Sequence, residues 1–354
     1  MKVLFDYQIF YQILGGASKY FVMMLSELPA NMWETTTLLS CNEYVREKRI
    51  FPYVGLHFKG QYRLLKYYLN PIYTNYRLRK GKFDVFHQTD YNPYCFNSLG
   101  SKPMVITFHD ANQALYDPVP EVLEYQKKSI RRADAIIAIS ENTKQDLIDI
   151  FGVDEKKITV IYHGIEKTDL TILPLRRYIN EPYILYVGRR SKYKNFHRFV
   201  EAFSQIHVAY PEIRVICTST PFTVEEIQMF NRLHITDRMI SVVADETTMK
   251  QLYRDAIFFI FPSVYEGFGM PILESWSCNC PVLLSRASCF PEIAGNAGLY
   301  FNPMDVEDIY VQMEKIIINT GLRKQLIQLG NERVNHFSWK TCANQHVKVY
   351  QSLL

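Results

Sequence analysis

Short runs of apolar residues alternate along this chain with segments in which apolar residues recur at helical spacing. The apolar runs predict a first series of strands at 2–5, 84–87, 104–108, 135–139 and 158–162, and a second series at 183–187, 213–217, 239–243, 257–261 and 282–284. Between the strands, helical spacing predicts helices at 121–132, 142–150, 195–208, 247–255 and 305–318. Because the strand runs are continuously apolar rather than alternating, they are typical of parallel strands buried on both faces.

The order of these elements predicts the fold class. Alternating strands and helices are typical of parallel sheets with right-handed crossovers. A polar, proline-containing stretch at 168–183 separates the two series. We therefore predict an α/β protein with two doubly wound, Rossmann-like parallel-sheet domains, 1–170 and 171–337, that face a cleft. Ligands of such sheets bind at the carboxyl ends of the strands, so the cleft is the expected site.

Composition and charge argue against several classes of protein. The chain is 48% hydrophobic and 21% charged, as is usual for a folded domain in water, and its formal charge of +4 gives no support to nucleic-acid binding. Seven scattered cysteines predict reduced thiols and a cytoplasmic location, and Cys278 and Cys280 lack partners at metal-ligand spacing. The opening residues MKVLFDYQIF lack the pattern of a secretory signal, and no apolar run reaches the roughly 18 residues of a membrane span.

The loop YEGFGMPILE, 265–274, interrupts the last strong strand–helix pair. Pro271 suits the start of a helix, so backbone N–H groups from 267 to 270 are expected to point at a ligand with the positive end of the helix dipole behind them. Glu266 in the loop and Glu274 in the first helical turn would then face the same ligand. A surface loop with solvated glutamates is the alternative reading of the same residues.

A second loop carries basic residues at the carboxyl end of a predicted strand. In YVGRRSKYKN, 186–195, a glycine turn is followed by Arg189 and Lys194, whose charges suit a diphosphate. Solvated cations in an ordinary strand-to-helix turn are the alternative.

Two weaker signals lie in the first half of the chain. Gly15 and Gly16 precede a helix, where their N–H groups could approach a phosphate closely, although the spaced glycines of a dinucleotide site are absent. His109 and Asp110 follow a strand end. For His109 the alternative is a buried, hydrogen-bonded structural residue.

Taken together, these residues carry a resemblance to a known family. FPSVYEGFGMPILESWSCNCPVLLS (261–285) with VGRRSKYKN (187–195) resembles glycosyltransferase family 4, the retaining nucleotide-sugar transferases of the GT-B fold. The resemblance extends over most of the chain, through GGASKY (15–20), FHD (108–110), ADAIIAISENTKQDL (133–147), YHGIE (162–166), SCFPEIAGNAGLYFNPMDVEDI (288–309) and FSWKTCANQHVKVY (337–350).

The resemblance implies a role for each candidate residue. The nucleotide-sugar donor would be bound by residues of three loops: Gly15, Gly16, Arg189, Lys194, Glu266, Gly267, Phe268, Gly269, Met270 and Glu274. Among these, Arg189 and Lys194 would hold the diphosphate, Glu266 the sugar and Glu274 the ribose hydroxyls. His109 would lie near the sugar and leaving group, and the last helix, 338–354, would cross back onto the first domain.

The chain departs from the family pattern at two places. Asn279 stands where most members have glycine, and since Asn tolerates the left-handed conformation, we expect the turn to be kept. The residues CTS, 217–219, stand where the family usually has a glycine after this strand. The identity of the donor's nucleotide base is therefore not predicted.

The resemblance also predicts the reaction. The catalytic group would be His109, Glu266, Arg189 and Lys194, with a retained anomeric configuration and no cofactor. No Asp-x-Asp occurs in the chain, so two cations would replace the usual metal ion at the leaving diphosphate. A GDP-mannose donor is favoured by similarity around FHDAN, 108–112, to bacterial polysaccharide mannosyltransferases, with a UDP-sugar next. A catalytically silent GT-B module that binds a nucleotide or partner, and a GT-B epimerase or phosphorylase, are the alternatives.

A basic, aromatic segment of the first predicted domain suggests how the acceptor is bound. Residues 44–82 contain ten Lys or Arg, one acid and nine Tyr or Phe, which predicts one or two amphipathic helices. Cationic, tyrosine-rich surfaces of this kind lie on anionic membranes without spanning them. The hypothesis is a glycan or lipid-linked glycan acceptor at the inner face of the cytoplasmic membrane. A solvated helix that packs its aromatic residues on the sheet is the alternative.

Overall fold

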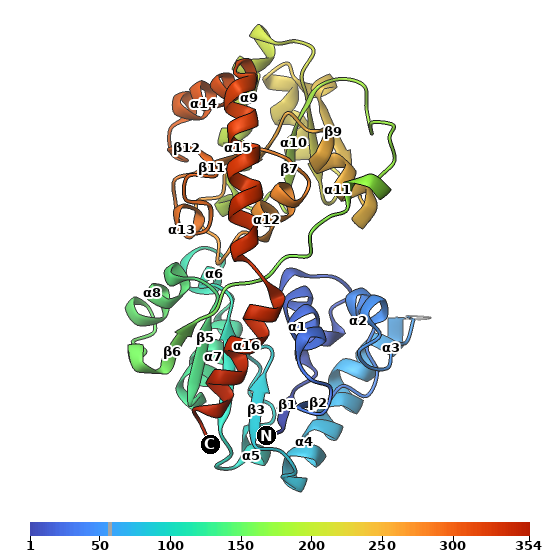
Figure 1. The fold of residues 1–354 in the computed structure, drawn as a ribbon, viewed down its shortest axis with the longest axis vertical. Coiled ribbons are helices and arrows are strands. Elements are labelled where there is room, and N and C mark those ends of the chain that lie inside the picture. The colour runs from blue at the N-terminus through green and yellow to red at the C-terminus, as the bar shows by residue number, and fades with distance from the viewer. Residues whose placement is uncertain (56–58) are drawn as a thin grey trace. The chain divides into compact units, whose positions relative to one another are not determined.

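Within the residues that the structure describes, two parallel sheets of six strands each organise the chain. The structure is a computed structural model that describes residues 1–55 and 59–354 (Figure 1). One unit comprises residues 1–164 with 338–354, and the other comprises residues 165–337. Every strand pair in both sheets is parallel, and each sheet is wound in two directions from a central strand. The predicted class, α/β with two doubly wound sheets, is confirmed.

The sheet of the first unit has the order β2-β1-β3-β4-β5-β6. Its strands are β1 (Val3–Phe5), β2 (Trp33–Thr35), β3 (Val85–Gln88), β4 (Met104–Phe108), β5 (Ala135–Ala138) and β6 (Ile158–Val160). Its helices are α1 (Gly16–Glu27), α2 (Glu43–Lys48), α3 (Lys59–Leu64), α4 (Asn70–Lys80), α5 (Phe96–Leu99), α6 (Asn112–Leu115), α7 (Pro120–Arg132), α8 (Glu141–Asp149) and α16 (Trp339–Gln351). Strand order reverses between β1 and β3.

The last helix completes the first unit. α16, at the red end of the chain, packs beside α1 in Figure 1, and Trp339, Cys342, His346 and Tyr350 on its inner face are buried. Gly164 meets the start of this helix so closely that an added Cβ would lie 2.6 Å from the Ser338 carbonyl carbon. The two ends of the chain therefore build one core.

The sheet of the second unit has the order β12-β11-β10-β7-β8-β9. Its strands are β7 (Tyr183–Val187), β8 (Arg214–Thr218), β9 (Met239–Val242), β10 (Phe258–Phe261), β11 (Val282–Ser285) and β12 (Leu299–Phe301). Its helices are α9 (Phe196–Ala209), α10 (Val224–Arg232), α11 (Glu246–Asp255), α12 (Met270–Ser277), α13 (Phe290–Ala294), α14 (Val306–Ile318) and α15 (Thr320–Arg333). Here the strand order reverses between β7 and β10.

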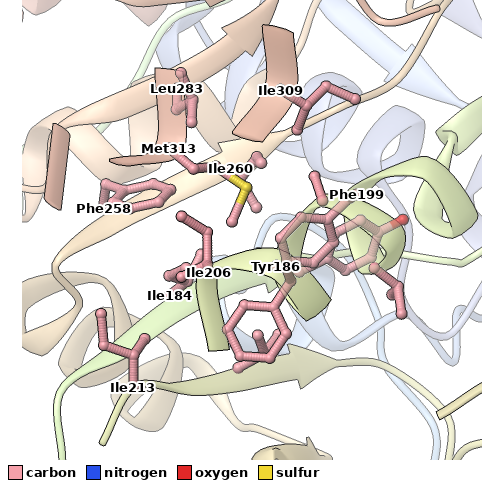
Figure 2. Packing of buried hydrophobic residues seen from close by; sticks show 14 of the residues in the cluster. Ile184, Tyr186, Phe199, Ile206, Ile213, Phe258, Ile260, Leu283, Ile309 and Met313 are labelled. Atoms are coloured by element: carbon pink, nitrogen blue, oxygen red, sulfur yellow. The ribbon is translucent and has the colours of Figure 1, made fainter. Parts of the chain in front are cut away.

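A continuous apolar core fixes those two central strands. Ile184 and Tyr186 of β7 and Ile260 of β10 pack against α9 and α14 (Figure 2). The Tyr186 ring stacks on Phe199 of α9 with centroids 6.0 Å apart. Burial of this apolar surface holds the strand ends, and the loops that leave them, in fixed positions.

Candidate functional site

The loop between β7 and α9 begins and ends at residues with left-handed backbone. Gly188 has φ +112°, and Asn195, the N-cap of α9, has φ +56°. The buried Asn195 amide donates to the Pro303 carbonyl oxygen at 2.6 Å, which fixes the end of the loop. Between them, residues 192–194 form a short 3₁₀ turn, η5 (Lys192–Lys194), that carries the basic side chains.

The structure brings together Lys194 and Glu266, which are far apart in the sequence. Lys194 Nζ lies 2.5 Å from Glu266 Oε1, and the two side chains are only 16% and 13% exposed. They meet because β7 and β10 are neighbours in the sheet, so that the loops at their carboxyl ends lie side by side. The Val264 N–H donates to the Tyr193 carbonyl oxygen at 2.8 Å and ties the two loops together. This is the point of strand reversal, where α/β sheets bind ligands.

The loop that carries Glu266 is held from several sides. Ser288 Oγ accepts from the Glu266 N–H at 3.1 Å and donates to its carbonyl oxygen at 2.6 Å. Phe268 is buried, with its ring edge-on to Phe337, so its backbone rather than its side chain is left for a ligand. Gly269 has φ +92°, and a Cβ there would lie 3.1 Å from Ile272 and Phe290 side-chain atoms. Both the backbone conformation and the space therefore require glycine at the N-cap of α12.

Glu274 lies on α12, half-buried. The Tyr253 hydroxyl donates to Glu274 Oε2 at 3.4 Å. Since α12 begins at Met270, Glu274 is its fifth residue, which corrects the expectation of a place in the first turn, because an α-helix has 3.6 residues per turn.

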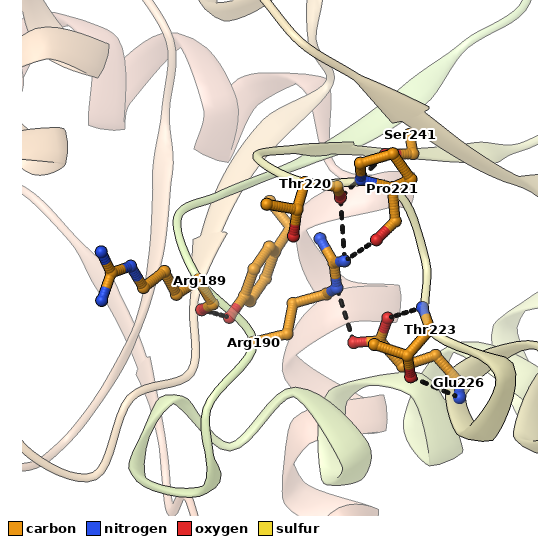
Figure 3. A network of polar contacts seen from close by, with 8 residues as sticks. Arg189, Arg190, Thr220, Pro221, Thr223, Glu226 and Ser241 are labelled. Atoms are coloured by element: carbon orange, nitrogen blue, oxygen red, sulfur yellow. Dashed lines mark hydrogen bonds and ion pairs between the residues drawn. The ribbon is translucent and has the colours of Figure 1, made fainter. Parts of the chain in front are cut away.

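Arg189 and Arg190 have different environments (Figure 3). The Arg189 side chain is exposed, while Arg190 is nearly buried, with its Nε 2.6 Å from Glu226 Oε1. Arg190 also donates to the Thr220 and Pro221 carbonyl oxygens at 2.9 Å. Sequence reasoning missed Arg190, although the capping-box pattern that Thr223 and Glu226 form could have shown that Glu226 was fixed in place.

Arg190 thus connects two loops. Its contacts tie the basic loop, residues 188–195, to the loop after β8. In that second loop Ser219 has φ +148°, a conformation that favours glycine.

In the first unit, His109 directly follows β4. Its N–H donates to the Tyr91 hydroxyl at 3.2 Å, and its ring is edge-on to Tyr20 at 5.3 Å. Burial lowers the pKa of His109 to about 4, so the imidazole is neutral at pH 7. Within residues 1–55 and 59–354, its buried Nε2 has no hydrogen-bond partner.

Another buried histidine connects α16 to α1. His346 Nδ1 lies 2.8 Å from the Cys342 carbonyl oxygen, and Nε2 lies 2.7 Å from the Tyr20 hydroxyl. Because a carbonyl oxygen only accepts, Nδ1 carries the proton and Nε2 accepts from Tyr20. Burial lowers the pKa of His346 to about 4 and keeps this neutral form.

The point of strand reversal in the first unit also gathers polar side chains, which sequence reasoning missed. Asp6, at the end of β1, is fully buried and accepts from Thr89 Oγ1 at 2.5 Å and from Gln8 Nε2 at 2.6 Å. Burial raises the pKa of Asp6 to about 6. Asp90 lies in the loop after β3, the strand that pairs with β1, and its carboxylate accepts from the Tyr91 N–H at 2.8 Å. A single aspartate after a strand carries little signal in a sequence.

The glycines predicted to bind donor open α1. Gly15 is the N-cap of α1 and Gly16 its first residue. A Cβ added to Gly16 would meet no atom within 4 Å, whereas one on Gly15 would lie 2.7 Å from Gln12 Oε1. The backbone at Gly16 is thus open to a ligand.

Clusters of metal-ligating side chains and membrane-spanning helices are both absent from residues 1–55 and 59–354. In the part of the chain that the structure describes, no three His, Cys, Asp or Glu side chains gather closely enough to hold a metal ion. Among the same residues, no helix has both the length and the apolar composition needed to cross a bilayer. All seven cysteines are buried and free.

Two doubly wound parallel-sheet units in one chain are the architecture of the GT-B fold. Solved structures of this fold superpose over nearly the whole chain. Anabaena Alr3699/HepE in complex with UDP and glucose gives a TM-score of 0.78 at 17% identity, covering 99% of this chain and 100% of that one. The lipopolysaccharide outer core galactosyltransferase WaaB gives 0.69 at 16% identity, covering 100% of both chains.

Sequence comparisons supply the family. The family model described as "Glycosyltransferase Family 4" matches residues 14–169, and the model described as "Glycosyl transferases group 1" matches residues 174–333. The chain belongs to the family 4 glycosyltransferases, as the resemblance predicted.

Two relatives carry names that concern O-antigen chains. The O-antigen chain mannosyltransferase B of Escherichia coli is 27% identical over 307 residues, 78% of this chain and 79% of that protein. The O-antigen chain mannosyltransferase RfbU of Salmonella typhimurium is 30% identical over 205 residues, 56% of this chain and 57% of that one.

Proposed function

We propose that this glycosyltransferase moves a mannosyl residue from GDP-mannose to a glycan or lipid-linked glycan during synthesis of a cell-surface polysaccharide. The names of the O-antigen mannosyltransferase relatives support both the pathway class and the sugar. A UDP-sugar is the second choice of donor, because structural neighbours were solved with UDP. The proposed place of action is the cytoplasm, at the inner face of the cytoplasmic membrane.

The Lys194–Glu266 pair carries this proposal. In the absence of donor, each of these two charges neutralises the other in a largely buried position. A diphosphate next to Lys194 would form an ion pair with the lysine. The Glu266 carboxylate would then be free to accept hydrogen bonds from sugar hydroxyls. The pair therefore suits a ligand that brings a negative charge and hydroxyl groups together, as a nucleotide sugar does.

The leaving diphosphate determines the proposed chemistry. Lys194, the exposed Arg189 and the backbone N–H groups at the start of α12 would offset the charge that develops on it. Glu274, held by Tyr253, would accept from the ribose hydroxyls. These groups would make a metal ion unnecessary. His109, neutral at pH 7, would orient the sugar by a hydrogen bond.

We propose further that the anomeric configuration is retained. A leaving phosphate that takes the acceptor's proton, on the same face of the sugar, needs no protein nucleophile. Proton NMR of the first-formed product would decide this point, since inversion would refute it.

Matched variants of the basic loop test the site. Lys194→Ala and Glu266→Ala are expected to lower kcat about 100-fold or more, because each removes a charge or hydrogen bond that acts on the transition state. Lys192→Ala removes an exposed cation two residues away and should change kcat less than about threefold. Circular dichroism should be unchanged for all three. Losses below threefold for both Lys194→Ala and Glu266→Ala would mean that the site lies elsewhere.

Donor hydrolysis separates a transferase from a silent module. Without acceptor, the enzyme should slowly hydrolyse its own donor within a panel of GDP- and UDP-sugars. A protein that binds nucleotide and hydrolyses none of the donors would favour the silent alternative.

A further inference from the structure

One face of the first unit combines exposed apolar and basic side chains. It is built on a helical run in which α3 passes into a π-helical turn, η2 (Leu65–Leu69), and then into α4. We call the outward side of residues 62–82 the α4 face. The run matches the predicted helices of 44–82, and π-helical turns occur frequently at functional sites.

The inward side of this run is fixed to the unit. The Asn70 side chain accepts from the Leu38 N–H at 3.0 Å, and Thr74 Oγ1 donates to Thr36 Oγ1 at 2.7 Å. Leu65 and Leu78 are buried on the same side. The α4 face is therefore a fixed surface and its outward side chains are presented together.

Those outward side chains are large and apolar. Ile72 is 68% exposed, Tyr68 61% and Tyr76 50%, and Leu64 and Leu69 are exposed beside them. Isoleucine gains free energy when it leaves water. Tyrosine has an apolar ring and a polar hydroxyl, which suits the boundary between headgroups and acyl chains.

Positive charge surrounds these residues. Residues 59–82 contain seven Lys or Arg and no acidic residue. Arg79, Lys80 and Lys82 are exposed, and Lys80 Nζ lies 4.6 Å from the centroid of the Tyr76 ring. The charge complements an anionic surface, because each basic residue near such a surface adds favourable binding energy.

A cavity of about 750 Å³ lies where this charge is densest. Its lining includes Ile72, Tyr76, Arg79 and Lys80 from α4, and Asn97 and Ser98 from α5. Cations, amides and a hydroxyl together suit a phosphate with attached hydroxyl groups, the chemistry of a phospholipid headgroup. The cavity is thus continuous with the exposed apolar side chains.

We propose that the α4 face binds an anionic phospholipid bilayer, with a headgroup phosphate in the cavity and Tyr68, Ile72 and Tyr76 in the interface. A soluble phosphate would account for the cations alone, whereas the exposed apolar side chains gain from contact with acyl chains. The same helical run reaches the strand reversal of this unit, since the Tyr7 hydroxyl donates to the Lys66 carbonyl oxygen at 2.9 Å. Lipid binding itself does not depend on the transfer reaction.

Vesicle flotation of the full chain tests whether the basic side chains of the α4 face bind anionic lipid. Wild-type protein should float with vesicles of phosphatidylglycerol in phosphatidylcholine, float less as salt rises, and stay behind with phosphatidylcholine alone. The double variant Arg79→Glu, Lys80→Glu should weaken the binding about thirtyfold or more, because each basic residue contributes roughly fivefold. The matched control is Lys156→Glu, Lys157→Glu, an equal charge change at exposed residues before β6, which should bind like the wild type.

A second variant distinguishes whether the α4 face binds a lipid bilayer or a soluble anion. The double variant Ile72→Ser, Tyr76→Ser keeps every charge and should weaken vesicle binding about tenfold. If it binds vesicles as tightly as the wild type, the apolar side chains do not enter the bilayer and the proposal fails. The proposal also fails if the wild type does not float with anionic vesicles at low salt, or if the charge variant and its control bind equally. Thermal unfolding should be unchanged in every variant, since the substituted side chains lie at the surface.

Discussion

Replacement of Gly164 by alanine should destabilise the first unit strongly. The new Cβ would lie 2.6 Å from the Ser338 carbonyl carbon and from Trp339 Cα, and closer still to the Trp339 nitrogen. All three atoms are backbone, so no rotamer change can relieve the overlap. Ordinary contact requires a shift of about 1 Å at the start of α16, which would loosen the buried Trp339.

The expected loss is about 3 kcal/mol, at the upper end of overpacking effects, after a small gain from the stiffer unfolded chain. For a unit of about 180 residues this corresponds to a decrease in Tm of about 6–12 °C. Calorimetry gives the Tm, and amide exchange across residues 339–351 should show faster exchange in α16. Gly16→Ala is the matched control, because its Cβ meets no atom within 4 Å. Equal Tm values for the two variants would refute the argument that contact with α16 requires glycine.

Three further outcomes are expected. Excess EDTA should change the transfer rate less than about twofold if, as we propose, cationic side chains offset the charge on the leaving diphosphate; full loss, restored by Mg²⁺ or Mn²⁺, would contradict this. Thermal stability should fall as pH decreases from 6.5 to about 4, because the unfolded chain binds protons that buried His346 does not. Asp6, whose pKa is raised to about 6, opposes this trend, while His109, whose pKa is also lowered to about 4, adds to it, so His346→Gln should make the fall smaller without abolishing it. Arg190→Lys should lower the free energy of unfolding by about 2 kcal/mol in urea titration, because it loses the forked contacts beside Glu226; exposed Arg189→Lys should change it less than about 0.5 kcal/mol.

The fold was predictable because its central strands are buried on both faces and read as continuous apolar runs. The two strands that were missed, β2 and β12, have three residues each and lie at sheet edges. In β2 the residues Trp33, Glu34 and Thr35 are all half-buried, so no apolar run marks them. Short edge strands are defined by their neighbours rather than by their own composition.

The candidate site was predictable in its parts but not in its contacts. The resemblance indicated Lys194 and Glu266 separately, whereas their pairing depends on β10 lying beside β7, which no local pattern encodes. Likewise, adjacent Arg189 and Arg190 look alike in the sequence, and only the position of Glu226 determines which one is buried. The turn at Asn279 was predicted correctly: its φ of +56° is left-handed.

The first unit is assembled from both ends of the chain, and this has a consequence for biosynthesis. On the ribosome, residues 1–164 emerge first, but α16 is made only after residues 165–337. At typical elongation rates of about 5–20 residues per second, the nascent first unit waits roughly 10–35 seconds for its last helix. During that interval Tyr20 and its apolar neighbours on α1 lack the cover that α16 provides. Chaperone dependence of this protein should therefore arise from its amino-terminal half, and truncation of the last 17 residues should trap the chain in that exposed state.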